Sequence, residues 1–233
     1  MKSDNPDRFL MALRGCYLFS GVNDGILQEL ARGCRLDSYP AGHALFDAGD
    51  EADGLRIIVA GLIRVWINDE DGKELTITLV EAGDPLGEIA LLDGRPRSAN
   101  ATTLEESTCL FLPSVSFEEV LNANPQFARQ IIISLCEILR RNTHDLSGFA
   151  FDTLQVRLAR KIHELAFIHA LIAGGTAKFD RLFSQTELAN MLGATREAVN
   201  KRLAEMVKAR LISFENGRIV VIQLDELAKV FEA

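Results

Sequence analysis

Residues 184–206 read SQTELANMLGATREAVNKRLAEM, and this stretch decides the fold of the C-terminal part of the chain. Ser184 and Glu187 have the spacing of a capping box, which predicts that a helix of about eight residues begins here. Gly193 can adopt the left-handed backbone conformation that a tight turn between two helices needs. Thr195 can cap a second helix that ends near residue 209. This pattern predicts a helix-turn-helix.

Apolar residues recur at helical spacing along the same stretch and are expected to lock the two helices together. They are Leu188, Ala189, Leu192, Val199, Leu203 and Met206. Behind the second helix, Asn216-Gly217 separates two short apolar runs at 211–214 and 218–222. Because Asn-Gly between alternating runs is a strong hairpin signal, the helix-turn-helix is predicted to carry a β-hairpin wing.

The second helix opens with polar residues that can read DNA bases. They are Arg196, Glu197, Asn200 and Lys201. Residues four apart are neighbours on a helix, so this set shares one face. In such motifs these residues enter the major groove, where Arg can bond guanine and Glu can accept from cytosine. The predicted phosphate contacts are Ser184, Thr195 and Arg202. The alternative is that Glu197 only complements the helix dipole on a solvated face.

The charge distribution fits a DNA-reading C-terminal part. The chain carries a net charge of −8, which argues against general binding of polyanions. Residues 181–218 contain seven basic and four acidic residues, a net charge of +3, which leaves −11 for the rest of the chain. A basic patch on an acidic protein suits a reader that must also release DNA.

The N-terminal half has a different pattern. Residues 1–35 are predicted to be helical, and from about residue 36 to residue 113 short apolar runs alternate with turn residues. The clearest runs are Leu55–Val59, Leu62–Ile67, Leu75–Leu79 and Thr108–Leu112. In the third run apolar residues alternate with threonine, which is typical of a half-buried strand. Several strands at this spacing predict a β-sandwich or β-roll.

A long helix is expected to begin at Pro125, because proline is favoured at the first helical position. A stripe along this helix steps by four and three residues, as a coiled-coil seam does. Its members are Ala128, Ile132, Leu135, Leu139, Asn142, Leu146 and Phe149. The stripe predicts a homodimer, and the alternative is a core helix of a monomer. A polar Asn142 in the seam would set its register.

Residues 85–99, PLGEIALLDGRPRSA, combine a glycine and an acid with a short apolar turn and two arginines. A short helix here would point backbone N–H groups at an anion, which Arg97 could clamp and Ser98 could bond. Glu88 suits ribose hydroxyls better than a phosphate. Phosphate and sugar together indicate a nucleotide, and the alternative is a charged surface loop.

With these motifs the chain resembles the family of the cyclic-AMP receptor protein and the fumarate–nitrate regulator, and is most similar to the cyclic-AMP receptor type. The similarity runs from about Leu18 to Ile222. The segment 87–99 resembles the phosphate-binding cassette of cyclic-nucleotide domains, and residues 195–199, TREAV, resemble the start of the family's recognition helix.

The resemblance implies an α+β fold in three parts. These are a jelly-roll-like cyclic-nucleotide β-roll with flanking helices at 1–123, a long dimerisation helix at 124–150 and a winged helix-turn-helix domain at 151–233. It implies that cyclic AMP shifts the homodimer to a DNA-binding arrangement and that the protein is an activator. The implied partners are RNA polymerase and double-stranded DNA with TGTGA-like half-sites in an inverted repeat.

The resemblance also implies an effector site. Its residues are Gly87, Glu88, Ile89, Ala90, Arg97, Ser98, Ala99, Asn142 and Thr143. Arg97 and Ser98 would hold the cyclic phosphate, and Glu88 would take the ribose 2′-hydroxyl. Gly87 and Ile89 would line the pocket.

Two residues, Asn142 and Lys201, depart from the pattern of the cyclic-AMP receptor type. In that type a Thr-Ser pair on the long helix contacts the base, and the matching residues here are Asn142 and Thr143. Because an amide can both donate and accept, cyclic GMP stays an alternative effector. Lys201 stands where the family has an arginine, so one contact to DNA is expected to be weaker.

Other classes of protein are disfavoured. The sequence shows no Ser/His/Asp set, metal cluster or Walker loop, which argues against an enzyme and a metal cofactor. Cys16, Cys34, Cys109 and Cys136 form no CxxC pair, so they are expected to be buried reduced thiols. The sequence has no signal peptide or membrane span, which predicts a cytoplasmic protein. A related regulator with another effector, or one active without a ligand, stays an alternative.

Overall fold

The computed structural model describes the backbone of residues 6–232, and the side chains within it except those of residues 6, 141–142 and 144–150. The described chain divides into two compact units. The division falls between residues 141 and 142, and residues 73–75 group with the second unit.

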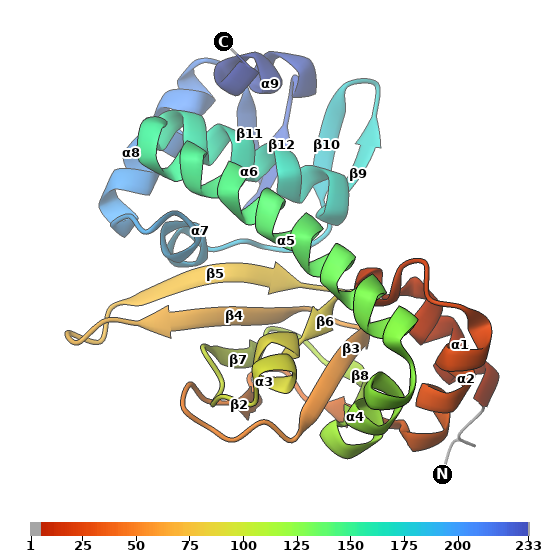
Figure 1. The fold of residues 1–233 in the computed structure, drawn as a ribbon. Coiled ribbons are helices and arrows are strands. Elements are labelled where there is room, and N and C mark those ends of the chain that lie inside the picture. Colours follow the sequence, from red (N-terminus) through yellow and green to blue (C-terminus); the bar gives the residue numbers. More distant parts are fainter. Residues whose placement is uncertain (1–5, 233) are drawn as a thin grey trace. The chain divides into compact units, whose positions relative to one another are not determined.

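The first unit combines a β-roll with helices on both sides of it in the sequence (Figure 1). Its helices are α1 (Pro6–Gly15), the short 3-10 turn η1 (Tyr17–Phe19), α2 (Asp24–Gly33), α3 (Glu88–Asp93), α4 (Ser114–Ala123) and the first part of α5 (Pro125–Phe151). Its strands are β1 (Arg35–Tyr39), β2 (Ala44–Phe46), β3 (Gly54–Ala60), β4 (Ile63–Asn68), β5 (Glu74–Val80), β6 (Pro85–Leu86), β7 (Asn100–Thr103) and β8 (Ser107–Pro113). The predicted β-roll and the predicted start of α5 at Pro125 are therefore confirmed.

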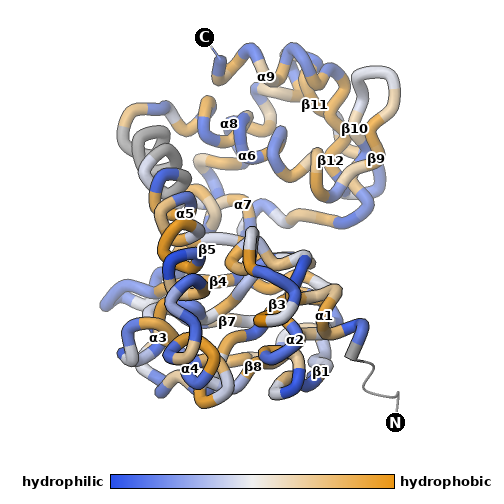
Figure 2. The backbone as a smooth tube through the Cα atoms, turned by 45° about the vertical axis from the view of Figure 1, so that its right-hand side comes forward, coloured by the Kyte–Doolittle hydropathy of each residue, from blue (hydrophilic) through white to orange (hydrophobic). Residues whose placement is uncertain are grey.

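The strands form two four-stranded sheets, with the orders β1-β8-β3-β6 and β2-β7-β4-β5. Strand β3 serves two cores, because successive side chains of a strand point to opposite faces. Leu55 and Ile57 contribute to a cluster with the helices α1, α2, α4 and α5. Ile58 joins a second cluster with residues of both sheets. Figure 2 shows hydrophobic and hydrophilic residues interspersed along these elements.

Strand β5 turns a different face inward from the one its pattern predicts. Ile77 is 54% exposed, whereas Thr76 is 6% exposed and its Oγ1 accepts a hydrogen bond from Arg64 Nε. The buried hydroxyl of Thr76 therefore has a polar partner on the neighbouring strand β4. The strand itself was predicted correctly, but alternation alone does not tell which of two half-apolar faces is buried.

Only some residues of the predicted seam on α5 are left exposed by their own chain. Ile132 and Leu139 are 59% and 66% exposed, as an interface would require. Leu135, in contrast, is partly buried against the core of its own β-roll. The side chains of Asn142, Leu146 and Phe149 lie outside the described residues.

The second unit is a winged helix-turn-helix (Figure 1). Its elements are α6 (Leu154–His169), β9 (Ala170–Ala173), β10 (Thr176–Phe179), α7 (Gln185–Leu192), α8 (Arg196–Lys208), β11 (Ile212–Glu215), β12 (Arg218–Val221) and α9 (Leu224–Glu232). Thr153 caps α6, accepting a hydrogen bond from Val156 N. The sheet has the order β11-β12-β10-β9, and residues 173–176 form the turn of a further hairpin between β9 and β10.

Candidate functional sites

The cassette turns sharply at Gly87 between β6 and α3. Gly87 has a φ of 89°, in the left-handed region that favours glycine. A Cβ atom at this position would lie 2.1 Å from Nη1 of Arg97. A second glycine, Gly94, ends α3 with a φ of 67°, and its N–H donates to the carbonyl of Ala90. The glycines of the motif therefore permit both the turn and the close approach of an arginine.

Arg97 is buried beneath this turn. Its Nη1 donates to the carbonyl oxygen of Gly87 at 2.8 Å, and its Nη2 donates to the carbonyl oxygen of Gly54 at 2.8 Å. Its guanidinium also lies over the ring of Phe46, 4.4 Å from the centroid. The residue is 3% exposed, so this side chain is held from several directions.

Asp53 joins Arg97 to a second arginine that the sequence analysis did not identify. Arg97 Nη2 donates to Asp53 Oδ1 at 2.6 Å, and Arg56 donates to both Asp53 oxygens at 3.0 and 2.8 Å. Burial would raise the pKa of Asp53, but the two guanidinium groups lower it below its ordinary value. Burial lowers the pKa of Arg97, an effect that Asp53 partly opposes.

This cluster of Asp53, Arg56 and Arg97 has chemistry that fits an anion. Two guanidinium groups share the carboxylate of Asp53, and the carboxylate of Glu88 also interacts electrostatically with Arg97. The Nε atoms of both arginines are buried and make no hydrogen bond within the described part of the chain. Because buried charges and donors are costly unless paired, a phosphate would complete the site.

Glu88 begins α3 beside this cluster. Burial raises the pKa of its carboxyl above the ordinary value, although backbone hydrogen bonds and the charge of Arg97 oppose the shift. A half-buried carboxylate at this place is an acceptor that suits a sugar hydroxyl.

The remaining predicted effector residues fall in different environments. The structure brings Gly87, Glu88 and Arg97 together, with Ala90 buried in α3. Ser98 is exposed and Ala99 is half-buried. Ile89 is 54% exposed on α3, so it does not line an enclosed pocket within this chain.

The two predicted base-contacting residues lie on α5. Thr143 is exposed, whereas the side chain of Asn142 lies outside the described residues. Both belong to the second unit and the cassette belongs to the first. Their joint role with the cassette stays a prediction.

The helix-turn-helix has the caps that its sequence predicts. Ser184 Oγ accepts from Glu187 N at 3.1 Å, and Glu187 Oε2 accepts from Ser184 N at 2.7 Å. Gly193 has a φ of 58°, and Thr195 Oγ1 accepts from Ala198 N at 3.2 Å. Arg181 pairs with Glu187 at 3.0 Å and so supports the capping box. Local hydrogen bonds therefore determine where α7 and α8 begin.

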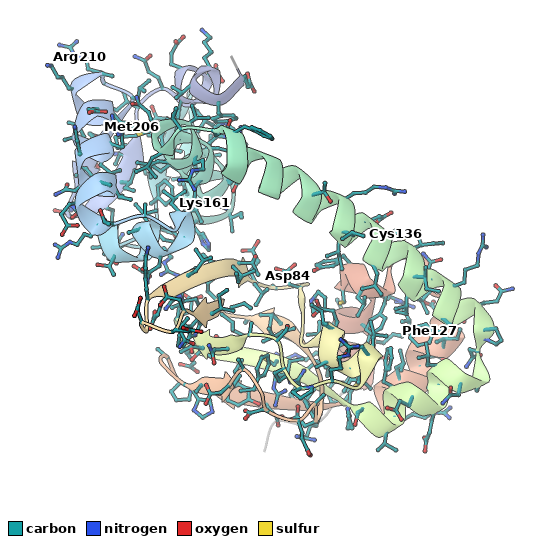
Figure 3. All side chains as sticks on the ribbon, turned by 60° about the vertical axis from the view of Figure 1, so that its left-hand side comes forward. Asp84, Phe127, Cys136, Lys161, Met206 and Arg210 are labelled. Atoms are coloured by element: carbon teal, nitrogen blue, oxygen red, sulfur yellow. The ribbon has the colours of Figure 1, made fainter. Side chains whose placement is uncertain are left out.

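The apolar residues predicted to lock α7 to α8 are all buried. They are Leu188, Ala189, Leu192, Val199, Leu203 and Met206. Figure 3 labels Met206 on α8. The wing follows α8, and its turn residues Asn216 and Gly217 have φ values of 52° and 78°. Both values are those of a tight hairpin turn.

The start of α8 presents the predicted reading residues to solvent. Arg196, Glu197, Asn200 and Lys201 are all exposed. Of the predicted phosphate contacts, Thr195 is exposed and Ser184 is half-buried. Arg202 is not on the same face: it is half-buried and pairs with Glu205 at 2.5 Å.

Gln185, the first residue of α7, was missed by the sequence analysis. Its Nε2 donates to Asn200 Oδ1 at 3.2 Å, and its Oε1 accepts from Arg196 Nε at 3.5 Å. It thus connects two of the exposed reading residues across the helix-turn-helix. The signal for it was present, since it directly follows the cap Ser184, where α7 begins.

The thiols differ in part from the prediction that all four are buried. Burial raises the pKa of Cys16 and Cys34 to about 12 and that of Cys109 to about 11. Cys136 is exposed on α5, so the prediction was wrong for this residue. Among the described residues, no group of three or more His, Cys, Asp or Glu side chains could hold a metal ion.

No helix among the described residues has the length and apolar character needed to cross a membrane.

Comparisons with known proteins agree with both halves of the structure. Residues 36–124 match the cyclic nucleotide-binding domain, and residues 156–230 match the Crp-like helix-turn-helix domain. The CRP-like cAMP-activated global transcriptional regulator of Mycobacterium tuberculosis is 27% identical over 91% of this chain and 95% of its own length. The cAMP-activated global transcriptional regulator CRP of Pasteurella multocida is 27% identical over 85% and 95%.

Solved structures show the same architecture. A CRP/FNR-family transcriptional regulator from Thermus thermophilus is 26% identical, covers 85% of this chain and 99% of that chain, and superposes with a TM-score of 0.71. The c-di-GMP responsive global regulator of Xanthomonas campestris shares the fold, with 20% identity over 85% of this chain and 99% of that chain and a TM-score of 0.73.

Proposed function

Because this chain belongs to the CRP/FNR family of transcription regulators, we propose that it is a cyclic-AMP-dependent regulator that binds specific DNA sites as a homodimer. The observation that carries the proposal is the pair of buried arginines, Arg56 and Arg97, that share the carboxylate of Asp53 beneath the Gly87 turn. Two guanidinium groups, each with an Nε atom that has no partner among the described residues, suit a phosphate that carries a single negative charge.

The effector would be held by residues of the cassette. Arg97 supplies the charge for the cyclic phosphate, and the hydroxyl of Ser98 adds a donor. Glu88 accepts from the ribose 2′-hydroxyl. The base meets Asn142 and Thr143 on α5. Cyclic AMP would not react in this site. It would bind more tightly to one arrangement of the dimer than to another, because its contacts are better in that arrangement.

The proposed switch is a shift of population. An effector changes an equilibrium only by the difference in its affinity for the two states. Cyclic AMP would favour the arrangement in which the two α8 helices of the dimer fit successive major grooves, which lie about 34–36 Å apart. The hinge would lie near residues 148–153, and the dimer would form along α5, where Ile132 and Leu139 are exposed.

The partners follow from this mechanism. A twofold dimer reads an inverted repeat, and we propose TGTGA-like half-sites contacted by Arg196, Glu197, Asn200 and Lys201. RNA polymerase is the proposed protein partner of an activator, and a protein that works on such sites is placed in the cytoplasm. Sedimentation of the free protein should give twice the mass of one chain; a monomer at micromolar concentration would contradict the dimer.

The effector proposal is tested by calorimetry with cyclic AMP and cyclic GMP in parallel. We expect saturable binding of cyclic AMP and, by fluorescence anisotropy, binding of an inverted-repeat duplex that tightens when cyclic AMP is added. Tighter binding of cyclic GMP would support the alternative that Asn142 favours guanine. Heat from neither nucleotide, with DNA binding that needs no addition, would support a ligand-independent regulator and overturn the proposal.

Effector binding is expected to weaken in mild acid because of Glu88. Its pKa is raised above the ordinary glutamate value of 4.5, so protonation begins at a pH where other glutamates stay ionised. The ionised carboxylate is the better acceptor for the 2′-hydroxyl, so affinity falls as the pH drops through this raised pKa. The effect on stability has the opposite sign, because a raised folded-state pKa makes the ionised form destabilising as the pH rises.

The control for this pH effect is Glu88→Gln. We expect it to bind cyclic AMP about tenfold more weakly at neutral pH, the usual effect of losing a charged hydrogen bond. Its affinity should not change between neutrality and mild acid. Parallel pH profiles of the variant and the natural protein, measured by titration calorimetry, would show that Glu88 does not bind the sugar.

Direct base reading by α8 is tested with Glu197→Ala. Loss of an acceptor for cytosine N4 is expected to cost about 1–3 kcal/mol on the specific site and to relax the preference at one base pair. Glu205→Ala is the matched control, because it removes the same charge from the same helix but from the side that pairs with Arg202. Retention of the half-site preference in Glu197→Ala would mean that Glu197 only stabilises the helix.

A further inference from the structure

Gln185 occupies a position between α7 and the exposed start of α8. It is half-buried, whereas its two partners Arg196 and Asn200 are exposed. The chain of contacts runs from Arg196 Nε to Gln185 Oε1 at 3.5 Å, and from Gln185 Nε2 to Asn200 Oδ1 at 3.2 Å. One side chain of the first helix therefore contacts two of the residues proposed to read bases on the second.

The chemistry of the three groups fixes the direction of both hydrogen bonds. A guanidinium nitrogen can only donate, so the atom of Gln185 that faces Arg196 must be its carbonyl oxygen. The amide nitrogen of Gln185 then faces Asn200. Because that nitrogen also only donates, the facing atom of Asn200 must be its carbonyl oxygen Oδ1. The amide of Asn200 is thereby held in one of its two possible orientations.

The fixed orientation decides what Asn200 can offer to DNA. Its Oδ1 is engaged by Gln185, whereas its Nδ2 makes no hydrogen bond to any other described residue. Asn200 therefore presents an amide donor. In the major groove guanine offers the acceptors O6 and N7, thymine offers O4 and adenine offers N7, whereas cytosine offers only the donor of its exocyclic amine. A donor therefore matches guanine, thymine or adenine and meets another donor in cytosine.

We propose that Gln185 is a specificity-determining positioning residue: it holds the Asn200 amide so that this residue selects a base with a major-groove acceptor, which is guanine, thymine or adenine, over cytosine. The inference rests on the proposed DNA-reading function and names the residue outside the recognition helix α8 that sets its hydrogen-bond polarity. Gln185 itself need not touch a base.

Two substitutions separate this role from a general structural one. Gln185→Met keeps the length of the side chain and removes its amide, so either orientation of Asn200 becomes available. Gln185→Glu keeps the acceptor for Arg196 but replaces the donor with a second acceptor. Asn200 then turns its Nδ2 toward Glu and presents Oδ1 to the groove, which matches adenine or cytosine.

The experiment is selection of binding sites from a duplex with one randomised half-site, using the full-length protein with cyclic AMP. The natural protein is expected to deplete cytosine at the base position where Asn200→Ala loses its preference. Gln185→Met should reduce that depletion by about 3- to 10-fold, the usual worth of one neutral hydrogen bond. Gln185→Glu should reverse the depletion and favour cytosine or adenine over guanine and thymine.

Thr186→Ala is the matched control, since Thr186 is the exposed next residue of the same helix. Its base preferences should equal those of the natural protein, and thermal melting should show that all variants are folded. In an Asn200→Ala background, Gln185→Met should have no further effect at this base pair. Unchanged depletion of cytosine in Gln185→Met, or a natural preference for cytosine there, would overturn the inference.

Failure of the inference and failure of the proposed function are distinguishable. If the natural protein selects no sequence at all, specific DNA reading itself is wrong. If it selects a clear half-site that Gln185→Met and Gln185→Glu reproduce unchanged, only the role of Gln185 is wrong.

Discussion

Replacing Arg97 with alanine is expected to reduce the affinity for cyclic AMP by about 100-fold or more, because truncating one partner of a buried, hydrogen-bonded charge pair costs about 2–5 kcal/mol. The cassette would lose the charge for the phosphate, and the carbonyl oxygens of Gly87 and Gly54 would lose their donor. Asp53 would keep both hydrogen bonds from Arg56, so the β-roll should still fold.

Titration calorimetry measures this loss, and two variants control it. Arg95→Ala removes an equal charge from an exposed position two residues away and should change the affinity little. Arg97→Lys keeps the charge but not the fork of donors, so it should fall between the natural protein and Arg97→Ala. An Arg97→Ala protein that binds cyclic AMP as tightly as the natural one would refute the assignment of the phosphate site.

Phe127→Ala is expected to lower the free energy of unfolding of the first unit by about 3–5 kcal/mol, the usual cost of removing a buried aromatic ring. Phe127 is 1% exposed in the first turns of α5. Its ring centroid lies 6.0 Å from that of Phe19 and 5.6 Å from that of Phe117. The ring therefore packs the long helix α5 against η1, which precedes the β-roll in the sequence, and against α4, which follows it.

Urea unfolding followed by tryptophan fluorescence measures this change, because Trp66 lies in strand β4 of the same unit. Met11→Ala is the control: Met11 is a large apolar residue of α1 that is 70% exposed, and its loss should change the stability by less than about 0.5 kcal/mol. Equal stabilities of the two variants would show that α5 is not anchored by Phe127.

The helix-turn-helix could be predicted almost completely from the sequence. Its caps, its glycine turn and its wing depend on hydrogen bonds and backbone conformations within a few residues, as at Ser184, Gly193 and Gly217. Such local signals do not depend on what the rest of the chain does. The further hairpin β9–β10 was missed, because four-residue strands carry too little periodicity to be distinguished from a loop.

The buried face of a helix or strand was harder to predict than the helix or strand itself. Strand β5 was placed correctly, yet Thr76 rather than Ile77 is buried. On α5 the stripe was found, but Leu135 packs against its own core and Cys136 is exposed. A period in the sequence tells that a face exists, whereas neighbouring strands and helices determine which face they cover.

The sequence by itself determined that a β-roll with an arginine-bearing cassette is followed along the chain by a helix-turn-helix, because capping, turn and alternation signals are local. Only the tertiary structure decided which side chains surround Arg97 in the cassette and Asn200 on α8. Asp53 and Arg56 reach Arg97 from strand β3 and the turn before it, and Gln185 reaches Asn200 from another helix. Hydrogen bonds and ion pairs between side chains depend on distances in space, and residues distant in sequence meet only when the packing of the elements brings them together.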